Sequence, residues 1–263
     1  MSLLILAIGL LGLAVGSFLN VVIHRVPAGR SIVRPASSCP GCGEAIRFRH
    51  NVPVLSWLWL RGRCATCAAP ISVRYPLVEL GTAVLFVAVT LELIATDRLA
   101  LAPALLFFTA LGIALAAIDL EVYRLPNALV LPAYPVLAAL LVFAAAAEHD
   151  ASILVRAAVG AAALGGGYLA IALARPGGMG FGDVKLAGLV GAVLGAVSYP
   201  ALIVGAFAAF LLGSLVGVVV MAARQASRRT ALPFGPFMVL GTLVALFLGA
   251  PLADTYTRLA FRA

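Results

Sequence analysis

Charged residues are scarce in this chain of 263 residues, of which only 11% are Asp, Glu, Lys or Arg. Hydrophobic residues make up 63% of it, and its mean hydropathy is +1.13. Soluble domains carry about a quarter charged residues, so the composition excludes that class and indicates a polytopic membrane protein. We interpret the net charge of +8 as a topology signal with some attraction to lipid head groups, and we expect membrane lipids but no nucleic acid among the partners.

Long apolar runs predict an all-α polytopic membrane protein with about eight transmembrane helices, because about 20 apolar residues cross a bilayer as a helix. The sixth run is short, and its boundary with the seventh is placed near Tyr199-Pro200. The predicted spans are residues 2–23, 77–96, 99–118, 128–147, 154–174, 186–199, 201–222 and 234–253.

The distribution of Lys and Arg predicts the orientation, because these residues accumulate in cytoplasmic loops. With the first loop inside, 14 of the 18 lie on the cytoplasmic side, and both termini lie outside. Residues 2–23 are interpreted as an uncleaved anchor, since their positive charges begin after the apolar run, at Arg25. Gly16, Ser17 and Asn20 within this run are interpreted as helix-packing positions.

The few cysteines are confined to the one sizeable polar loop, residues 24–76. They form two C-x-x-C pairs, Cys39 with Cys42 and Cys64 with Cys67, separated by 21 residues. This spacing is typical of structural four-cysteine zinc sites, and two disulfides are the alternative. A cytosolic loop is kept reduced, so we expect a small cytoplasmic domain with a closed, structural Zn²⁺ site.

Acidic residues number only ten, and two of them stand at predicted span ends on the same side of the membrane. Asp119 ends the third span, and Asp183 opens the sixth after the glycine-rich stretch at residues 177–185, GGMGFGDVK. Both could simply cap helices and complement their dipoles. Two carboxylates at one depth could instead share a proton and activate a water for peptide hydrolysis. The three histidines show no elbow motif that would favour a Ser-His-Asp arrangement.

Several stretches combine into a longer pattern: GSFLNVVIHRVP, CPGCG with CATC, NVPVLSWLWLRGRC, PISVRYPLVEL, IDLEVYRLPN and GMGFGDVKLAGLVGA. Together they resemble the type IV prepilin peptidases, the bifunctional leader peptidase and N-methyltransferase family of GxGD aspartyl proteases. The resemblance runs from residue 16 to about residue 195, and beyond it covers only hydropathy and the PFGPF segment at residues 233–237.

The resemblance implies a bacterial inner-membrane enzyme that removes the basic leader of type IV prepilins or type II secretion pseudopilins at the cytoplasmic face. It also implies methylation of the new amino terminus with S-adenosylmethionine. The family's catalytic aspartates fall on Asp119 and Asp183, and its zinc ligands on Cys39, Cys42, Cys64 and Cys67.

The resemblance divides the chain into a first helix at residues 1–23, a methyltransferase-associated zinc loop at 24–76 and a protease core at 77–263. Gly62 in LRGRC is the expected cofactor-binding position. A Rossmann-type site for the methyl donor would need a strand followed by a glycine-rich turn and a helix, and the sequence shows no such pattern. The methyltransferase prediction therefore depends on the resemblance alone.

Some positions depart from the family pattern. Glu121 and Asn127 stand where many relatives have Asp, and His50 replaces a more usual acidic residue. Three alternatives stay open: a peptidase without methyltransferase activity, a transporter that keeps acids in the membrane, and a scaffold that docks through its zinc loop. A transporter would place its acids near the midplane and often show internal repeats, and we find no repeat.

Overall fold

The computed structural model describes residues 1–175, 179–223 and 232–260. Gly177 and Gly178 of the glycine-rich stretch lie outside the described residues, as do Arg224, Arg228, Arg229 and Arg262 of the charge count. Within the described part, the regular structure is helical and contains no β-strand, as the predicted fold class requires.

The long helices correspond one to one to the predicted spans. The elements are α1 (Ser2–Arg25), η1 (Phe48–His50), α2 (Leu55–Trp59), α3 (Arg74–Ala95), η2 (Leu99–Leu101), α4 (Ala102–Val122), α5 (Asn127–Ala147), α6 (Ser152–Ala174), α7 (Phe181–Val197), α8 (Tyr199–Ala222) and α9 (Gly235–Ala260). Among the described residues, six helical segments are long and apolar enough to cross a membrane. The other two long helices are α7, with 17 residues, and α9, whose apolar part is Gly235–Gly249.

The boundary between the sixth and seventh spans lies at Ser198, just before the predicted Tyr199-Pro200 boundary. Helix α7 ends at Val197 and α8 begins at Tyr199. The side chain of Ser198 between them accepts a hydrogen bond from the backbone N–H of Ala201, so it caps α8. The shortness of α7 is therefore real and not a displaced boundary.

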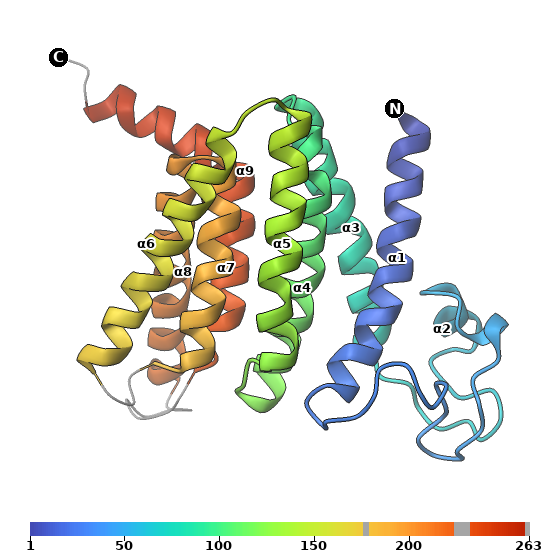
Figure 1. Cartoon of the computed structure of the whole chain (residues 1–263). Helices are drawn as coiled ribbons and strands as arrows, with labels where there is room; N and C mark the ends of the chain where they lie inside the picture. The colour runs from blue at the N-terminus through green and yellow to red at the C-terminus, as the bar shows by residue number, and fades with distance from the viewer. Residues whose placement is uncertain (176–178, 224–231, 261–263) are drawn as a thin grey trace. The chain divides into compact units, whose positions relative to one another are not determined.

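The chain divides into two compact units. One comprises Met1–Asp97 with Thr109–Ala114, and the other comprises Arg98–Phe108 with Leu115–Ala263. In the first unit, α1 packs along α3 (Figure 1). A Cβ atom at Gly16 would lie 2.6 Å from the Cα of Glu79, so only glycine allows the two backbones to approach this closely.

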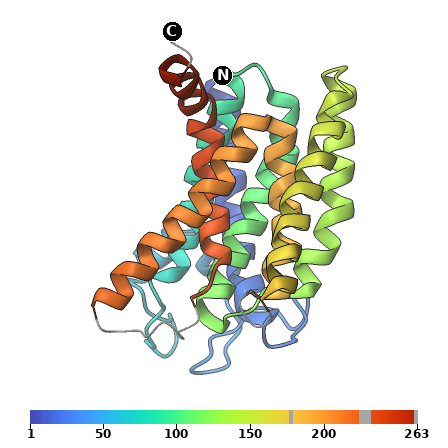
Figure 2. The same ribbon diagram turned by 90° about the vertical axis from the view of Figure 1, so that its left-hand side faces the viewer.

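The second unit is built around α7. Nearly every residue of this helix from Leu186 to Ala196 is buried. Its main neighbour is α6, and α8 pairs with α9; each pair runs side by side in both views (Figures 1 and 2). Close contact between α6 and α7 depends on small residues, because a Cβ atom at Gly160 would fall on the carbonyl oxygen of Gly191.

The carboxyl end of α7 is held by Arg98. Its guanidinium donates to the carbonyl oxygens of Val197 and Ala196 and pairs with Glu148 at 3.8 Å. Arginine at a helix C-terminus satisfies carbonyl groups that lack partners within the helix and opposes the negative end of its dipole. The loop that follows α7 is thereby fixed to the turn between α5 and α6.

Substitution of Gly160 by alanine tests the packing of α6 on α7. We expect Gly160→Ala to destabilise the protein by about 1–3 kcal/mol, because the added methyl group has no room between two backbones. Gly166→Ala on the same helix is the matched control, since its Cβ would meet nothing within 4 Å. Thermal unfolding in detergent measures both, and equal transition temperatures would contradict this packing.

Candidate functional site

Asp119 lies in the last turn of α4 and is only 5% exposed. The helix ends soon after it, because Tyr123 adopts the left-handed conformation with φ 54° and its N–H donates to the backbone carbonyl of Asp119. A left-handed residue at this position is a common way to end a helix. The sequence places an ionisable group at the boundary where the helix must stop.

The carboxylate of Asp119 is held by the start of α9. The backbone N–H of Gly235 donates to its Oδ2 at 3.0 Å. The first N–H groups of a helix have no partner within the helix and carry the positive end of its dipole, so they stabilise a carboxylate. A Cβ atom at Gly235 would lie 2.8 Å from the same oxygen. A larger residue at position 235 would therefore press against this carboxylate oxygen.

Asp183 lies in the first turn of α7 and is partly buried. Gly180 precedes the helix in an extended conformation and occupies the N-cap position, with no hydrogen bond from a side chain. Asp183 therefore does not fill the N-cap position that the sequence offered as the alternative to a catalytic role, although its charge in the first turn suits the helix dipole. A Cβ atom at Gly180 would lie 3.2 Å from Asp183 Oδ2, so this carboxylate lies close to the glycine that begins the helix.

The structure brings the two aspartates together in the second unit. Leu125, in the loop after α4, is the neighbour of both sites: a Cβ atom at Gly182 would lie 3.0 Å from Leu125 Cβ, and one at Gly235 would lie 3.3 Å from Leu125 Cδ2. The negative charge of Asp119 acts on the Asp183 carboxyl group. The end of α4 and the start of α7 therefore form one candidate carboxylate site.

Two contacts from α5 hold the start of α7 in place. The ammonium group of Lys185 donates to Asn127 Oδ1 at 2.9 Å, and the Tyr134 hydroxyl donates to the Lys185 carbonyl oxygen at 2.6 Å. Asn127 is one of the positions that depart from the family pattern. Its neutral oxygen accepts a hydrogen bond from the lysine without adding a further negative charge.

Aromatic rings line the neighbourhood of the carboxylates. Tyr168 of α6, Phe210 of α8 and Phe234 pack together with ring centroids 5.4–6.1 Å apart, and Phe237 contacts Phe234 at 6.2 Å. Tyr168 is only 3% exposed. Since Phe234 and Phe237 flank Gly235, this cluster fixes the PFGPF segment against the site.

The four cysteines form a second site, in the first unit. Their sulfur atoms lie within 4.8 Å of one another, with Cys39 and Cys67 3.8 Å apart. Each pair sits in a tight turn closed by an antiparallel bridge, Ser38 with Ala45 and Arg63 with Pro70. All four cysteines are free thiols, so the disulfide alternative is not what the structure shows.

This cluster fits a tetrahedral zinc ion. Sulfur ligands at about 2.3 Å from Zn²⁺ stand about 3.8 Å apart, close to the spacing between Cys39 and Cys67. Backbone N–H groups of Cys67 and Thr66 lower the pKa of the Cys64 thiol to about 6, which favours the thiolate that binds metal. A closed four-sulfur site leaves no position for a substrate.

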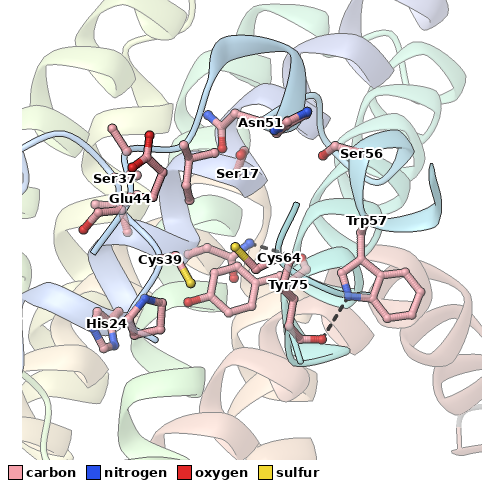
Figure 3. Close-up of a pocket in the computed structure, with 18 of the residues that line it drawn as sticks. Ser17, His24, Ser37, Cys39, Glu44, Asn51, Ser56, Trp57, Cys64 and Tyr75 are labelled. Carbon is pink, nitrogen blue, oxygen red and sulfur yellow. Dashed lines mark hydrogen bonds between the residues drawn. The ribbon is translucent and has the colours of Figure 1, made fainter. Parts of the chain in front are cut away.

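A cavity of about 760 Å³ lies beside the cysteines in the same unit. Its lining includes Ser17 of α1, Trp57 of α2 and Tyr75 of α3 (Figure 3). Asn20 and Glu79, which are 3% and 8% exposed, also line it. Of the α1 positions assigned to packing from sequence, Gly16 packs against α3, whereas Ser17 and Asn20 face this cavity. Its volume suits a small organic ligand.

Gly62 does not belong to the lining of this cavity. It has φ +65°, and a Cβ atom there would lie 2.9 Å from Trp57 Cζ2. The indole N–H of Trp57 donates to the Ile71 carbonyl at 3.1 Å, and the Ile71 N–H donates to the Gly62 carbonyl at 2.7 Å. Gly62 therefore supports the tryptophan that lines the cavity.

Comparison with known proteins matches each half of the chain to a family model. Residues 10–93 match the bacterial Peptidase A24 N-terminal domain, and residues 106–221 match the type IV leader peptidase family. No solved structure matches the chain significantly.

Full-length relatives agree with the two domain matches. The prepilin leader peptidase/N-methyltransferase of Aeromonas hydrophila is 37% identical over 95% of this chain and 91% of its own length. The protein of that name from Pseudomonas aeruginosa is 35% identical over 95% of this chain and 92% of its own. The one from Myxococcus xanthus is 53% identical over 46% of this chain and 36% of its own. By sequence along nearly its whole length, this chain belongs to the type IV leader peptidase family.

Proposed function

We propose that this protein is a membrane aspartyl endopeptidase that removes the leader of type IV prepilins or type II secretion pseudopilins and then methylates the new amino terminus. Its relatives carry both activities in their names. The observation that carries the peptidase half is the meeting of Asp119 and Asp183 beside Leu125. The positive-inside distribution of Lys and Arg supports a site at the cytoplasmic face of a bacterial inner membrane.

The two carboxylates together can hydrolyse a peptide bond without a covalent intermediate. Like charges held close together in a poorly hydrated site do not both ionise, so the pair retains one proton. The ionised carboxylate removes a proton from a bound water while the protonated one donates to the carbonyl oxygen of the scissile peptide. The N–H of Gly235 remains on Asp119 Oδ2 and keeps that carboxyl group oriented. The pair titrates as a unit, so the roles of acid and base belong to both residues together.

Replacement of either aspartate by asparagine tests this assignment. We expect Asp119→Asn and Asp183→Asn each to lower the rate of leader removal by at least about 100-fold, because neither amide can exchange the shared proton. Gel mobility of a model prepilin incubated with each purified variant measures the rate. Asp97→Asn is the control, since Asp97 is exposed and belongs to the other unit. Normal cleavage by either active-site variant would refute the pair.

Gly235 is a positioning residue in this proposal. Gly235→Ala puts a methyl group against Asp119 Oδ2 and should lower kcat by roughly 100-fold with little change in KM, because the carboxylate is displaced while the substrate surface is intact. Gly167→Ala is the matched control, since its Cβ would meet nothing within 4 Å. Steady-state kinetics with a leader peptide separates the two constants. A change confined to KM would show that Gly235 contacts the substrate instead.

The cavity in the first unit is the proposed site of methyl transfer. It combines aromatic rings with buried polar groups, which suits a nucleoside-containing ligand such as S-adenosylmethionine. Ser17, Trp57 and Tyr75 are the residues that would hold it, and its sulfonium group would supply the methyl group. Gly62, the cofactor-binding position expected from sequence, would act through Trp57. This unit contains the whole of the polar loop that the family resemblance associates with methylation.

The cysteine cluster is proposed to hold one structural zinc ion. Its role is to close the loop between α1 and α3, whose described residues include only two short helical turns. A loop of this size has little hydrophobic core of its own, so metal binding supplies much of its folding free energy.

Replacement of one ligand tests the metal. We expect Cys64→Ser to lose most of its zinc and to make the loop more susceptible to limited proteolysis, since three ligands hold the ion far less well than four. Elemental analysis of purified protein gives the zinc content per chain. Thr66→Ala is the control, because it keeps the backbone N–H that points to Cys64 Sγ. Equal zinc in both variants would exclude the four-cysteine site.

A further inference from the structure

Glu79 is a buried carboxylate that the proposed peptidase and zinc sites do not use. It lies on α3, where the backbone of α1 approaches at Gly16, and it lines the cavity of the first unit. An acid within a membrane helix is costly to keep, so it is expected to have a specific partner or function. The partners present in the structure account for only part of its capacity to accept hydrogen bonds.

One partner is the backbone of an unusual turn. The N–H of Val54 donates to Glu79 Oε2 at 2.7 Å. Val54 has φ 60° and ψ −50°, and the N–H of Leu55 donates to the Pro53 carbonyl at 2.6 Å, which together define a γ-turn. This turn is rare and strained, above all with a β-branched residue at its centre. The conformation that directs the Val54 N–H toward this carboxylate is therefore a strained one, and it costs the loop some conformational free energy.

Ser17 of α1 lines the same cavity as Glu79. An ionised carboxylate offers about four acceptor positions, so the Val54 N–H leaves most of them available. This fixed donor also orients the carboxylate, and binding sites hold an acceptor ready for a ligand in this way.

Asn20 supplies another unused acceptor in the same cavity. Its Nδ2 donates to the Tyr75 carbonyl at 3.1 Å. A carbonyl oxygen can only accept a hydrogen bond, so the amide nitrogen of Asn20 must face Tyr75. The amide oxygen Oδ1 therefore points away from the Tyr75 carbonyl. Asn20 is only 3% exposed, and its Oδ1 is buried without a hydrogen-bond partner. An unpaired buried acceptor is costly and calls for a donor.

From these contacts we infer that Glu79 and Asn20 form a binding site for a primary ammonium group. Such a group offers three N–H donors and one positive charge, which matches two buried acceptors and one negative charge. The inference depends on the proposed methyltransferase function, because the amino terminus of the cleaved substrate is the ammonium group that this reaction must receive. The nitrogen must lose one proton before it can be methylated, and the Glu79 carboxylate that binds it can accept that proton.

The methyl donor also carries an ammonium group, so the test distinguishes the two sources. Binding is measured on the purified full-length protein through Trp57 fluorescence or thermophoresis. The probes are a peptide with the first ten residues of the processed substrate, its N-acetylated twin, S-adenosylhomocysteine, and 5′-methylthioadenosine, which lacks the amino-acid part.

The diagnostic variant is Glu79→Gln. Its amide oxygen can still accept from Val54, so a purely structural role for Glu79 survives while the charge is lost. Glu92→Gln, on the same helix but outside the cavity lining, is the matched control. We expect the parent and the control to bind the free peptide about 10-fold or more tightly than the acetylated one, and Glu79→Gln to lose that preference. Methylation of the cleaved substrate should fall in parallel, while leader removal stays at the parental rate.

Each other outcome is equally specific. Loss of affinity for S-adenosylhomocysteine but not for 5′-methylthioadenosine would retain the ammonium site and assign it to the donor. Unchanged binding of all four probes and unchanged methylation by Glu79→Gln would overturn the inference and leave the proposed function intact. A parent protein that neither cleaves nor methylates would refute the proposed function itself.

Discussion

The hydrogen bond from the Gly235 backbone to Asp119 is the contact on which the carboxylate site depends. A negative charge at the end of a membrane helix needs donors, because surrounding hydrocarbon offers none. The start of α9 supplies one from a segment 116 residues away in sequence. The same contact joins α9 to the end of α4, and the rings of Phe234 and Phe237 on either side anchor it to α6 and α8. One hydrogen bond therefore both orients the Asp119 carboxylate and helps to hold α9 against α4.

Close approach of helix backbones is the second constraint that both units share. Hydrocarbon gives two apolar helices little reason to associate, so packing and polar contacts must hold them together. Glycine at positions 12 and 16 brings α1 against α3, and glycine at 160, 191 and 195 brings α6 against α7. Gly16 lies directly against Glu79, whereas Gly160, Gly191 and Gly195 meet along the middle and the carboxyl end of α7. Tight packing at Gly16 limits how far Glu79 can shift.

Much of this arrangement could be predicted from sequence, because it depends on the type and spacing of the side chains. Hydropathy predicted every long helix, the cysteine spacing predicted the thiol cluster, and loop charges placed Asp119 and Asp183 at one level. The contacts of Gly235 and Val54 were not predicted. Every residue except proline has a backbone N–H, so the sequence does not mark which of them binds a side chain, and the partner here is far away in the chain. The PFGPF motif was the one available signal for Gly235. Ser17 and Asn20 were assigned to packing because small polar residues in a span suit a helix interface and a cavity equally well.

The attachment of Arg98 to the last carbonyl groups of α7 has a mechanical consequence. Asp183 lies at one end of this helix, and the arginine, tied also to Glu148, grips the other. The start of the helix is held as well, because Lys185 contacts Asn127 and Tyr134 of α5. A shift of α7 along its axis would therefore break contacts at both of its ends. The depth of the Asp183 carboxylate is thus set by attachments that lie outside the carboxylate site.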